Sequence, residues 1–264
     1  FFSKCPPPEM YPNEIRFCSD PAYVGLLEEV GADVIELTGD HFGDYGVEAM
    51  QETLRLYQAK GMPYYGGGAN AAEARQAVTF EHHGNRIAFI GCNAKGIDYY
   101  ASATDTSPGA VACDLDWMSA EVARLKAEGY LVIATFQHIE YDAYDPDPTL
   151  KQDLQRIAKA GATIVSGSQA HQPHGMSFQD DAFIHYGLGN LFFDQYRYYP
   201  GGELDYGFID WHIIYAGKHI STRLVTISWV DLAKNRFTTP TEREKFLQTI
   251  FNVSQWEVSE PAQP

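Results

Sequence analysis

The stretch DVIELTGDHFGDYG, Asp33–Gly46, decides how the rest of the sequence is interpreted. It begins as an apolar run that predicts a buried strand over Val34–Thr38, which the next glycine ends. Asp40, His41 and Asp44 then follow closely, and two further glycines let the backbone bend. The stretch therefore joins a strand to a turn whose side chains can bind metal ions or move protons.

An amphipathic helix is predicted directly after this turn, over Val47–Lys60, and Gly61 is its stop signal. Open α/β sheets place their sites just beyond the carboxyl ends of strands, which is where these polar groups fall. A simpler alternative is that Asp40 or Asp44 only caps the helix. The Asp–His–Asp cluster taken as a whole favours a site.

Helix and strand patterns alternate in the first part of the chain, whereas hairpins dominate its last part. This order predicts an α/β fold, a layered α/β sandwich with mixed sheets rather than a purely parallel sheet. We expect one domain over residues 1–230, followed by a C-terminal helix and tail over residues 231–264. The further predicted helices cover residues 21–30, 71–76, 114–128, 149–160 and 241–251.

The charge balance limits the classes of partner. The chain of 264 residues has a formal net charge of −16 and no Lys/Arg cluster, which argues against nucleic acids and anionic membrane surfaces. A polyanionic substrate would need bound cations to reverse the local sign. No apolar run is long enough to span a membrane. The opening Phe1-Phe2-Ser3-Lys4 carries no signal peptide or initiator Met, so we expect a portion of a longer, processed protein.

The four cysteines fall into two local pairs. Cys5 and Cys18 bracket a Pro-rich segment, and Cys92 and Cys113 bracket a loop rich in small residues. Two disulfides would staple these irregular segments and would indicate an oxidising compartment. Four free thiols in a cytosolic protein are the alternative. No CxxC pair occurs, so the sequence does not favour a cysteine zinc site.

Two more predicted strands end in histidine-bearing loops. His138 and Glu140 follow the strand over Leu131–Phe136, and His171 and His174 follow the strand over Thr163–Ser166. We expect the three loops to meet at one sheet edge. Imidazole and carboxylate groups bind divalent zinc, manganese or iron, and two ions about 4 Å apart could share the loops. Each histidine taken alone is more simply a hydrogen-bonding residue.

Other chemistries have weaker support. Ser166, Ser168 and Ser177 lie near histidines, but no GxSxG motif exists. Glu36 with Asp40 could form a glycosidase carboxylate pair. The triple glycine at positions 66–68 lacks both phosphate-loop patterns and is better interpreted as a tight turn.

Four segments resemble one known family. They are ELTGDHFGDYG at residues 36–46, IATFQHIEYD at 133–142, VSGSQAHQPHG at 165–175 and IHYGLGNLFFDQ at 184–195. In this order they resemble the NNHxxDxG-like segment, the His/Glu strand end, the GHxPH-like loop and the YSLGNFVFDQ-like run of the CapA family. That family, also called the poly-γ-glutamate capsule family, is related to calcineurin-like metallophosphoesterases.

The resemblance implies a metallophosphoesterase-like fold and a metal-dependent hydrolase or transferase that makes, anchors or releases an anionic envelope polymer. A small phosphoester or peptide is the other substrate class, and other envelope-synthesis proteins are possible partners. It also implies an extracellular or cell-surface location, with an anchor outside this chain. By position it implies catalytic roles for His41, His171, Asp44 and Glu140, a substrate-side role for Asn190, and one or two divalent ions on Asp40, His41, His138, His171 and His174.

The sequence also departs from the family pattern. The N-terminal GD and NLE-like segments have no counterpart, and Asp40 stands where relatives carry Asn. Ser168 and Gln169 replace a frequent histidine, and His138 and Glu140 are more closely spaced than usual. These departures support an alternative function, a non-catalytic polymer-binding or scaffold protein with a degenerate metal site.

Overall fold

The computed structural model describes residues 1–6, 16–95, 101–191, 206–231 and 234–256, and the chain divides into two compact units. Unit 1 comprises Phe1–Phe80, Ile87–Met118 and Thr135–Gln137; unit 2 comprises Glu81–Arg86, Ser119–Ala134 and His138–Pro264. The helix α4 and the strands β4, β5 and β7 contribute residues to both units; their bounds are Leu115–Ala127, Val78–His82, Asn85–Asn93 and Leu131–Gln137. The predicted domain boundary at residue 230 stays a prediction.

Unit 1 combines short strands with one long helix. Its own elements are η2 (Pro21–Val24), α1 (Gly25–Glu29), β1 (Ile35–Glu36), η3 (Asp40–Gly43), α2 (Gly46–Lys60), β2 (Tyr64–Tyr65), β3 (Gly67–Gly68), α3 (Ala71–Ala74) and β6 (Gly109–Ala110). The strand β1 pairs with β2 in parallel, β3 pairs with β6 antiparallel, and β4, β5 and β7 are neighbours in that order. This framework carries the loop that follows β1.

The core of unit 1 forms where α2 packs beside β1. Leu54 and Tyr57 of α2 are buried with Leu37, Val24 and Met62. The helix ends at Gly61, which has the left-handed φ of 66° that favours glycine. The predicted helix over Val47–Lys60 is therefore confirmed, and it anchors the chain immediately after the candidate site.

The triple glycine is explained by close packing. A Cβ on Gly66 would lie 2.5 Å from Thr38 Cγ2, and one on Gly67 would lie 2.8 Å from Leu37 Cβ. Gly66 also has a positive φ of 73°. Only glycine therefore lets β3 approach the residues that follow β1. The predicted tight turn was wrong, because Gly67–Gly68 is a short strand paired with β6.

Unit 2 is built on a mixed sheet. Its strands β8 (Ile164–Ser168), β9 (Met176–Gln179) and β10 (Ala182–His185) follow β7 in the order β7-β8-β10-β9. The central β10 runs parallel to β8 and antiparallel to β9, which confirms the mixed sheet predicted from the sequence. A second sheet has the order β11-β12-β13, and the strands cover Tyr206–Tyr215, Lys218–Asp231 and Lys234–Phe237.

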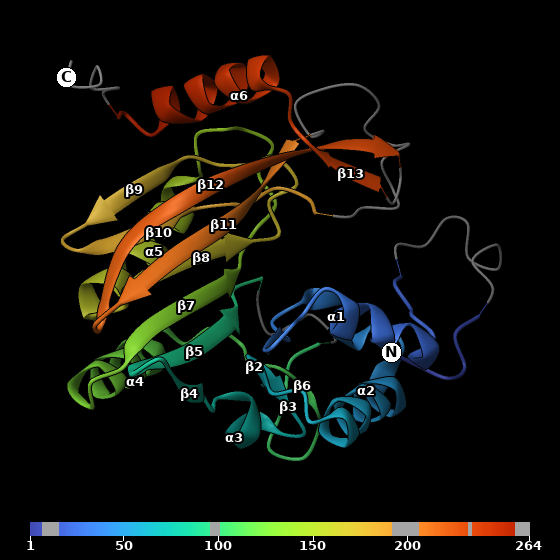
Figure 1. Ribbon diagram of the computed structural model, residues 1–264. Helices are drawn as coiled ribbons and strands as arrows, with labels where there is room; N and C mark the ends of the chain where they lie inside the picture. Colours follow the sequence, from blue (N-terminus) through green and yellow to red (C-terminus); the bar gives the residue numbers. More distant parts are fainter. Residues whose placement is uncertain (7–15, 96–100, 192–205, 232–233, 257–264) are drawn as a thin grey trace, which may run out of the picture. The chain divides into compact units, whose positions relative to one another are not determined.

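Unit 2 is layered, as Figure 1 shows. The helix α5 (Pro148–Ala160) packs with a buried apolar face on β8 and β10. Elsewhere in the unit, Ile164 and Phe183 share a core with Phe208 of β11. The helix α6 (Pro240–Val253) adds Phe246 to this core, with its ring centroid 4.7 Å from that of Phe208. The layered α/β architecture is therefore confirmed.

Some local predictions were wrong. The helix predicted over residues 21–30 is not a continuous amphipathic helix: Tyr23, Leu26 and Val30 are exposed and only Val24 is buried in it. A 3-10 turn followed by a short α-helix breaks the expected periodicity. The strands β9 and β13 were not predicted. The end of the 184–195 motif and the end of the predicted C-terminal tail lie outside the described residues.

Both predicted disulfides are present. Cys5 bonds to Cys18 and Cys92 bonds to Cys113.

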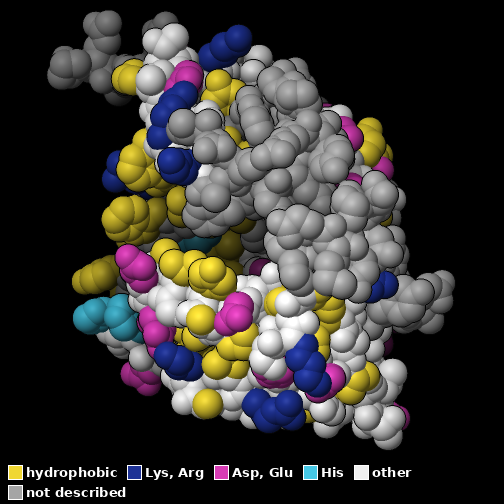
Figure 2. Space-filling view, turned by 90° about the vertical axis from the view of Figure 1, so that its right-hand side faces the viewer, with side chains coloured by type: hydrophobic (Ala, Val, Ile, Leu, Met, Phe, Trp, Pro, Cys, Tyr) yellow, Lys and Arg dark blue, Asp and Glu magenta, His cyan; other side chains and the backbone are white. Residues whose placement is uncertain are grey.

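On the face shown in Figure 2, Lys and Arg side chains are interspersed with Asp and Glu. In the described ranges, no helix has the length and apolar character needed to cross a membrane.

Candidate functional site

Asp40, the first carboxylate of the loop after β1, is held in place by the last residue of β7. Gln137, the last residue of β7, accepts a hydrogen bond from the Asp40 backbone N–H at 2.6 Å and donates one to Asp40 Oδ1 at 2.6 Å. Asn93 at the end of β5 donates to the Thr38 carbonyl oxygen at 2.8 Å. Two strand ends therefore fix the start of η3, and Asp40 becomes a buried group of fixed orientation.

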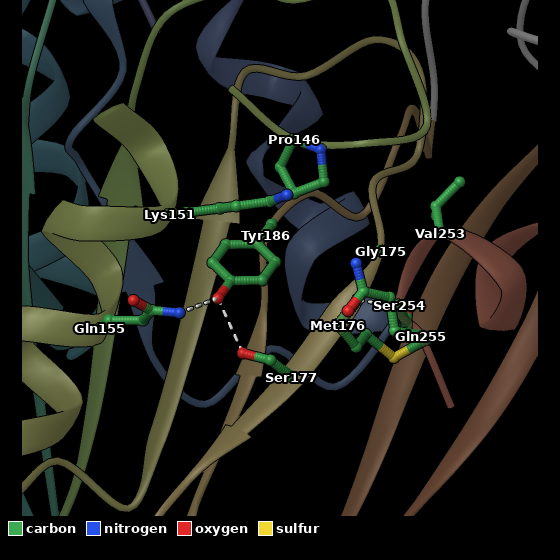
Figure 3. A pocket seen from close by; sticks show the side chains of 10 residues that line it. All are labelled: Pro146, Lys151, Gln155, Gly175, Met176, Ser177, Tyr186, Val253, Ser254 and Gln255. Atoms are coloured by element: carbon green, nitrogen blue, oxygen red, sulfur yellow. Dashed lines mark hydrogen bonds between the residues drawn. The ribbon is translucent and has the colours of Figure 1, made fainter. Parts of the chain in front are cut away.

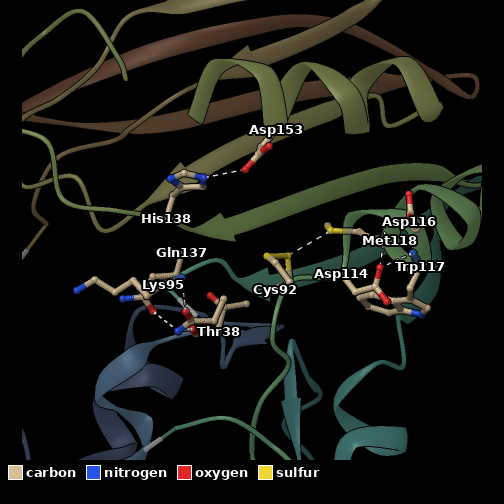
Figure 4. The surroundings of a disulfide bond; sticks show 12 residues. Thr38, Cys92, Lys95, Asp114, Asp116, Trp117, Met118, Gln137, His138 and Asp153 are labelled. Atoms are coloured by element: carbon tan, nitrogen blue, oxygen red, sulfur yellow. Dashed lines mark hydrogen bonds and ion pairs between the residues drawn. A yellow bond between two sulfur atoms is a disulfide. The ribbon is translucent and has the colours of Figure 1, made fainter. Parts of the chain in front are cut away.

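A lysine neutralises this carboxylate. Lys95 Nζ lies 2.7 Å from Asp40 Oδ2, and both side chains are largely buried. Burial alone would raise the pKa of Asp40, but hydrogen bonds from Lys95 and Gln137 and the nearby His41 outweigh it and lower the pKa. Figure 4 shows Lys95, Gln137 and Thr38 together beside the Cys92 disulfide. Asp40 is therefore ionised at neutral pH, and its carboxylate is already paired with the Lys95 ammonium group.

The other two predicted residues of this loop form an Asp–His pair. His41 Nδ1 lies 2.8 Å from Asp44 Oδ2, and the Phe17 backbone N–H donates to the same oxygen at 2.7 Å. An ionised carboxylate only accepts, so Nδ1 carries the proton and Nε2 keeps its lone pair. The edge-on ring of Phe17 lies 4.4 Å from the His41 ring, measured between centroids.

The charges around His41 favour its protonated form. Burial lowers the pKa of His41, but the Asp44 hydrogen bond and the charges of Asp40 and Asp44 outweigh it, so the net pKa is raised. The side chain is 36% exposed, and Nε2 lies 3.9 Å from Asp40 Oδ1. A histidine whose imidazolium is stabilised by neighbouring carboxylates and which is reachable from solvent can take up and deliver protons.

The loops of unit 2 bring three predicted residues together. His171 Nδ1 lies 2.9 Å from Asn190 Oδ1, and Asn190 Nδ2 donates to the His171 carbonyl at 3.3 Å. His171 Nε2 lies 3.9 Å from Glu140 Oε1, which also accepts a bond from Gln169 at 2.6 Å. Glu140, His171 and Asn190 therefore form one polar group.

The other two histidines of unit 2 that were predicted as site residues are buried. His138 Nε2 lies 3.0 Å from Asp153 Oδ2, and its Nδ1 has no hydrogen-bond partner among the described residues. His174 Nδ1 donates to the Ala143 carbonyl at 2.6 Å. Burial lowers the pKa of His174 to about 4, so this side chain is neutral at physiological pH. Roles for three of these residues, Asp153, Phe17 and Lys95, were not predicted. Asp153 and Lys95 have partners that are distant in sequence, and Phe17 acts through its backbone N–H.

The described residues do not fit a metal ion within either unit. Among them, no three His, Cys, Asp or Glu side chains are grouped so that they could hold one ion. An ion on Asp40 would also have to displace Lys95. His41 belongs to unit 1 and His138 and His171 to unit 2, so the predicted meeting of the three loops, and the metal roles assigned to them, stay predictions.

Two alternative sites gain no support from the local geometry. Ser177 Oγ shares its hydrogen bond with Tyr186 rather than with a histidine. Glu36 accepts a bond from Thr38, and burial raises its pKa, so it is a locally satisfied buried acid.

Sequence comparison identifies relatives of the chain. Residues 5–195 match the family model described as bacterial capsule synthesis protein PGA_cap. The capsule biosynthesis protein CapA of Bacillus anthracis is 27% identical over 188 residues, which cover 69% of this chain and 45% of that protein. The PGA biosynthesis protein CapA of Bacillus subtilis (strain 168) is 26% identical over 185 residues, 69% of this chain and 48% of that protein. The chain thus spans less than half the length of these relatives.

Structural comparison gives the fold alone. The Haemophilus influenzae NAD nucleotidase (NadN) aligns with a TM-score of 0.50 and 12% identity, over 88% of this chain and 43% of that one. The likeness confirms the predicted metallophosphoesterase-like α/β fold.

Proposed function

Because the chain belongs to the PGA_cap family of bacterial capsule synthesis proteins, we propose that it acts in the cell envelope on an anionic capsule polymer of the poly-γ-glutamate class. Its proposed reaction is hydrolysis or transfer at an amide bond of that polymer. The two disulfides support a location outside the reducing cytosol. The names of the curated relatives support the polymer class.

The hydrogen-bonded pair of His41 and Asp44 is the observation that carries the proposed reaction. Asp44 orients the ring and stabilises the imidazolium that forms when Nε2 takes a proton. The raised pKa makes His41 a stronger base than an unperturbed histidine, which favours proton removal from an attacking group.

The proposed step moves one proton through His41. Nε2 removes a proton from an attacking water as the water oxygen bonds to the amide carbon. The same nitrogen then gives that proton to the leaving amine as the C–N bond breaks. An amine of a second chain in place of water gives transfer instead of hydrolysis. No part of this step uses a metal ion.

The test measures new amine ends released from poly-γ-glutamate by the purified chain. We expect His41→Ala to lose the activity by about 100-fold or more, the low end for a general base. His82→Ala is the matched control, since His82 is exposed on a hairpin of unit 2. Equal rates for wild type and His41→Ala would reject the proposal.

A second function has one specific observation in its favour. Lys95 and Gln137 already occupy both oxygens of Asp40, as in a site that holds structure rather than performs chemistry. A non-catalytic polymer-binding protein would bind poly-γ-glutamate in a titration with and without chelator and release no amine ends. Turnover that depends on His41 excludes this function.

A further inference from the structure

A small cavity in unit 2 is lined by several side chains that can donate hydrogen bonds. Its volume is about 170 Å³, and its polar lining includes Lys151, Gln155, Ser177 and Tyr186. Figure 3 shows the hydroxyls of Ser177 and Tyr186 pointing toward one another, with Gln155 on the other side of the phenol. Met176 and Val253 provide apolar wall.

Counting hydrogens shows that one hydroxyl proton is left over. Ser177 Oγ and Tyr186 OH lie 2.7 Å apart, so their bond uses one of their two protons. Gln155 Nε2 donates to Tyr186 OH at 3.2 Å, so the phenol oxygen is already an acceptor. Among the described residues, the other hydroxyl proton has no acceptor. Whichever hydroxyl donates to the other, one O–H remains for a ligand in the cavity.

Lys151 supplies a positive charge to the lining of the cavity. Its ammonium pairs with Asp145 at 2.6 Å, and the side chain of Asp145 is 65% exposed. Such a surface pair contributes little free energy, and two further N–H groups of Lys151 remain available to a ligand. Asp145 keeps the local charge small, which favours a monoanion over a dianion such as hydrogen phosphate.

We propose that this cavity binds a small carboxylate, with Lys151 and the Ser177–Tyr186 hydroxyl pair holding its two oxygens. The volume is below the roughly 300–1,000 Å³ of pockets for drug-sized ligands, so it fits a free amino acid or the end residue of a chain. The proposal does not rest on the His41–Asp44 pair, because every residue that lines the cavity belongs to unit 2.

Calorimetric titration of the whole chain tests the proposal with four probes: L-glutamate, a γ-glutamyl oligomer, acetate and inorganic phosphate. Binding of free glutamate identifies a free amino acid as the ligand, and binding of the oligomer alone identifies a chain end; either result supports the site. No binding of any carboxylate, or tighter binding of phosphate, overturns it.

Variants of the residues that line the cavity then test whether the ligand binds there. We expect Lys151→Met to weaken binding at least tenfold, as for a lost hydrogen bond from a charged group. Lys159→Met is the matched control, because Lys159 is exposed on the last turn of α5. Each of Ser177→Ala and Tyr186→Phe leaves one free hydroxyl proton and should weaken binding less than the double variant does.

An unchanged affinity in both Lys151→Met and the double variant overturns the proposal. Shifts of the Gly175 and Ser177 amide resonances on titration provide a second readout that needs no substitution. His41→Ala should bind the same probe as wild type, so this test and the test of the proposed reaction can fail separately.

Discussion

Lys95 Nζ lies 2.7 Å from Asp40 Oδ2, although the two residues are separated by 55 positions in the sequence. The family resemblance assigns Asp40 to a metal, but in this chain an ammonium group occupies its carboxylate. Pairing with Lys95 lowers the pKa of Asp40, and the charge of Asp40 raises the pKa of His41 while that of Lys95 lowers it. The pair therefore links the structural role of Asp40 to the proton chemistry of the neighbouring histidine.

Removing Lys95 should leave a buried, unpaired carboxylate. We expect Lys95→Met to lower the free energy of unfolding by about 3 kcal/mol, the cost of breaking a buried ion pair from one side. The double variant Asp40→Asn with Lys95→Met should recover much of this loss, because no charge is then left unpaired. Urea unfolding measures both variants, and a loss below about 0.5 kcal/mol in Lys95→Met contradicts a buried pair.

Chelation tests the role of Asp40 in a second way. Because Lys95 already holds Asp40, we expect the cleavage rate to be unchanged after treatment with EDTA and removal of the chelator. Metal analysis of the same sample shows whether any ion was removed. Loss of activity that zinc or manganese restores would instead support the metal roles predicted from the sequence.

The disulfide Cys5–Cys18 adjoins Phe17, whose backbone N–H donates to Asp44. Replacing both cysteines by serine should cost about 2–4 kcal/mol of stability and loosen this contact. We therefore expect a several-fold lower activity and an altered pKa of His41, measured by NMR. Leu154→Ala, a buried position of α5 in unit 2, is the control: it should lose stability but keep the pKa. Identical His41 titration in all three proteins would contradict this link.

Because Glu36 is buried, we expect the free energy of unfolding to depend on pH. Burial raises the pKa of Glu36 above its ordinary 4.5, despite hydrogen bonds from Thr38, Thr135 and Tyr65. The folded protein therefore binds this proton more tightly than the unfolded chain, and stability falls as the pH rises above 4.5. Glu36→Gln cannot lose a proton, so urea unfolding at pH 7 should show it to be more stable than wild type. At pH 4 the two should be similar; equal stability at pH 7 is the contrary result.

The parts of the fold with a strong local pattern were predictable from the sequence. Apolar periodicity and a following glycine located α2, and Pro148 with Gly161 bounded α5. The strand β9 was missed because it is short and alternates weakly, although the Asp180–Asp181 turn after it is a hairpin signal. The exposed Tyr23 and Leu26 show that apolar spacing alone does not establish burial.

The candidate site was predictable only in part. Asp40, His41 and Asp44 lie within one loop, so their spacing in the sequence indicated the cluster. Lys95 and Gln137 reach Asp40 from 55 and 97 positions away, and no local pattern reveals such pairing. Phe17 acts through its backbone N–H, for which the residue type carries no signal.

The pH dependence of poly-γ-glutamate cleavage by wild type and Asp44→Asn tests the central claim most directly. Asp44 raises the pKa of His41, so its loss should lower that pKa, shift the acidic limb of kcat/KM to lower pH and reduce kcat. A rate and a pH profile identical to those of wild type would contradict a catalytic His41–Asp44 pair.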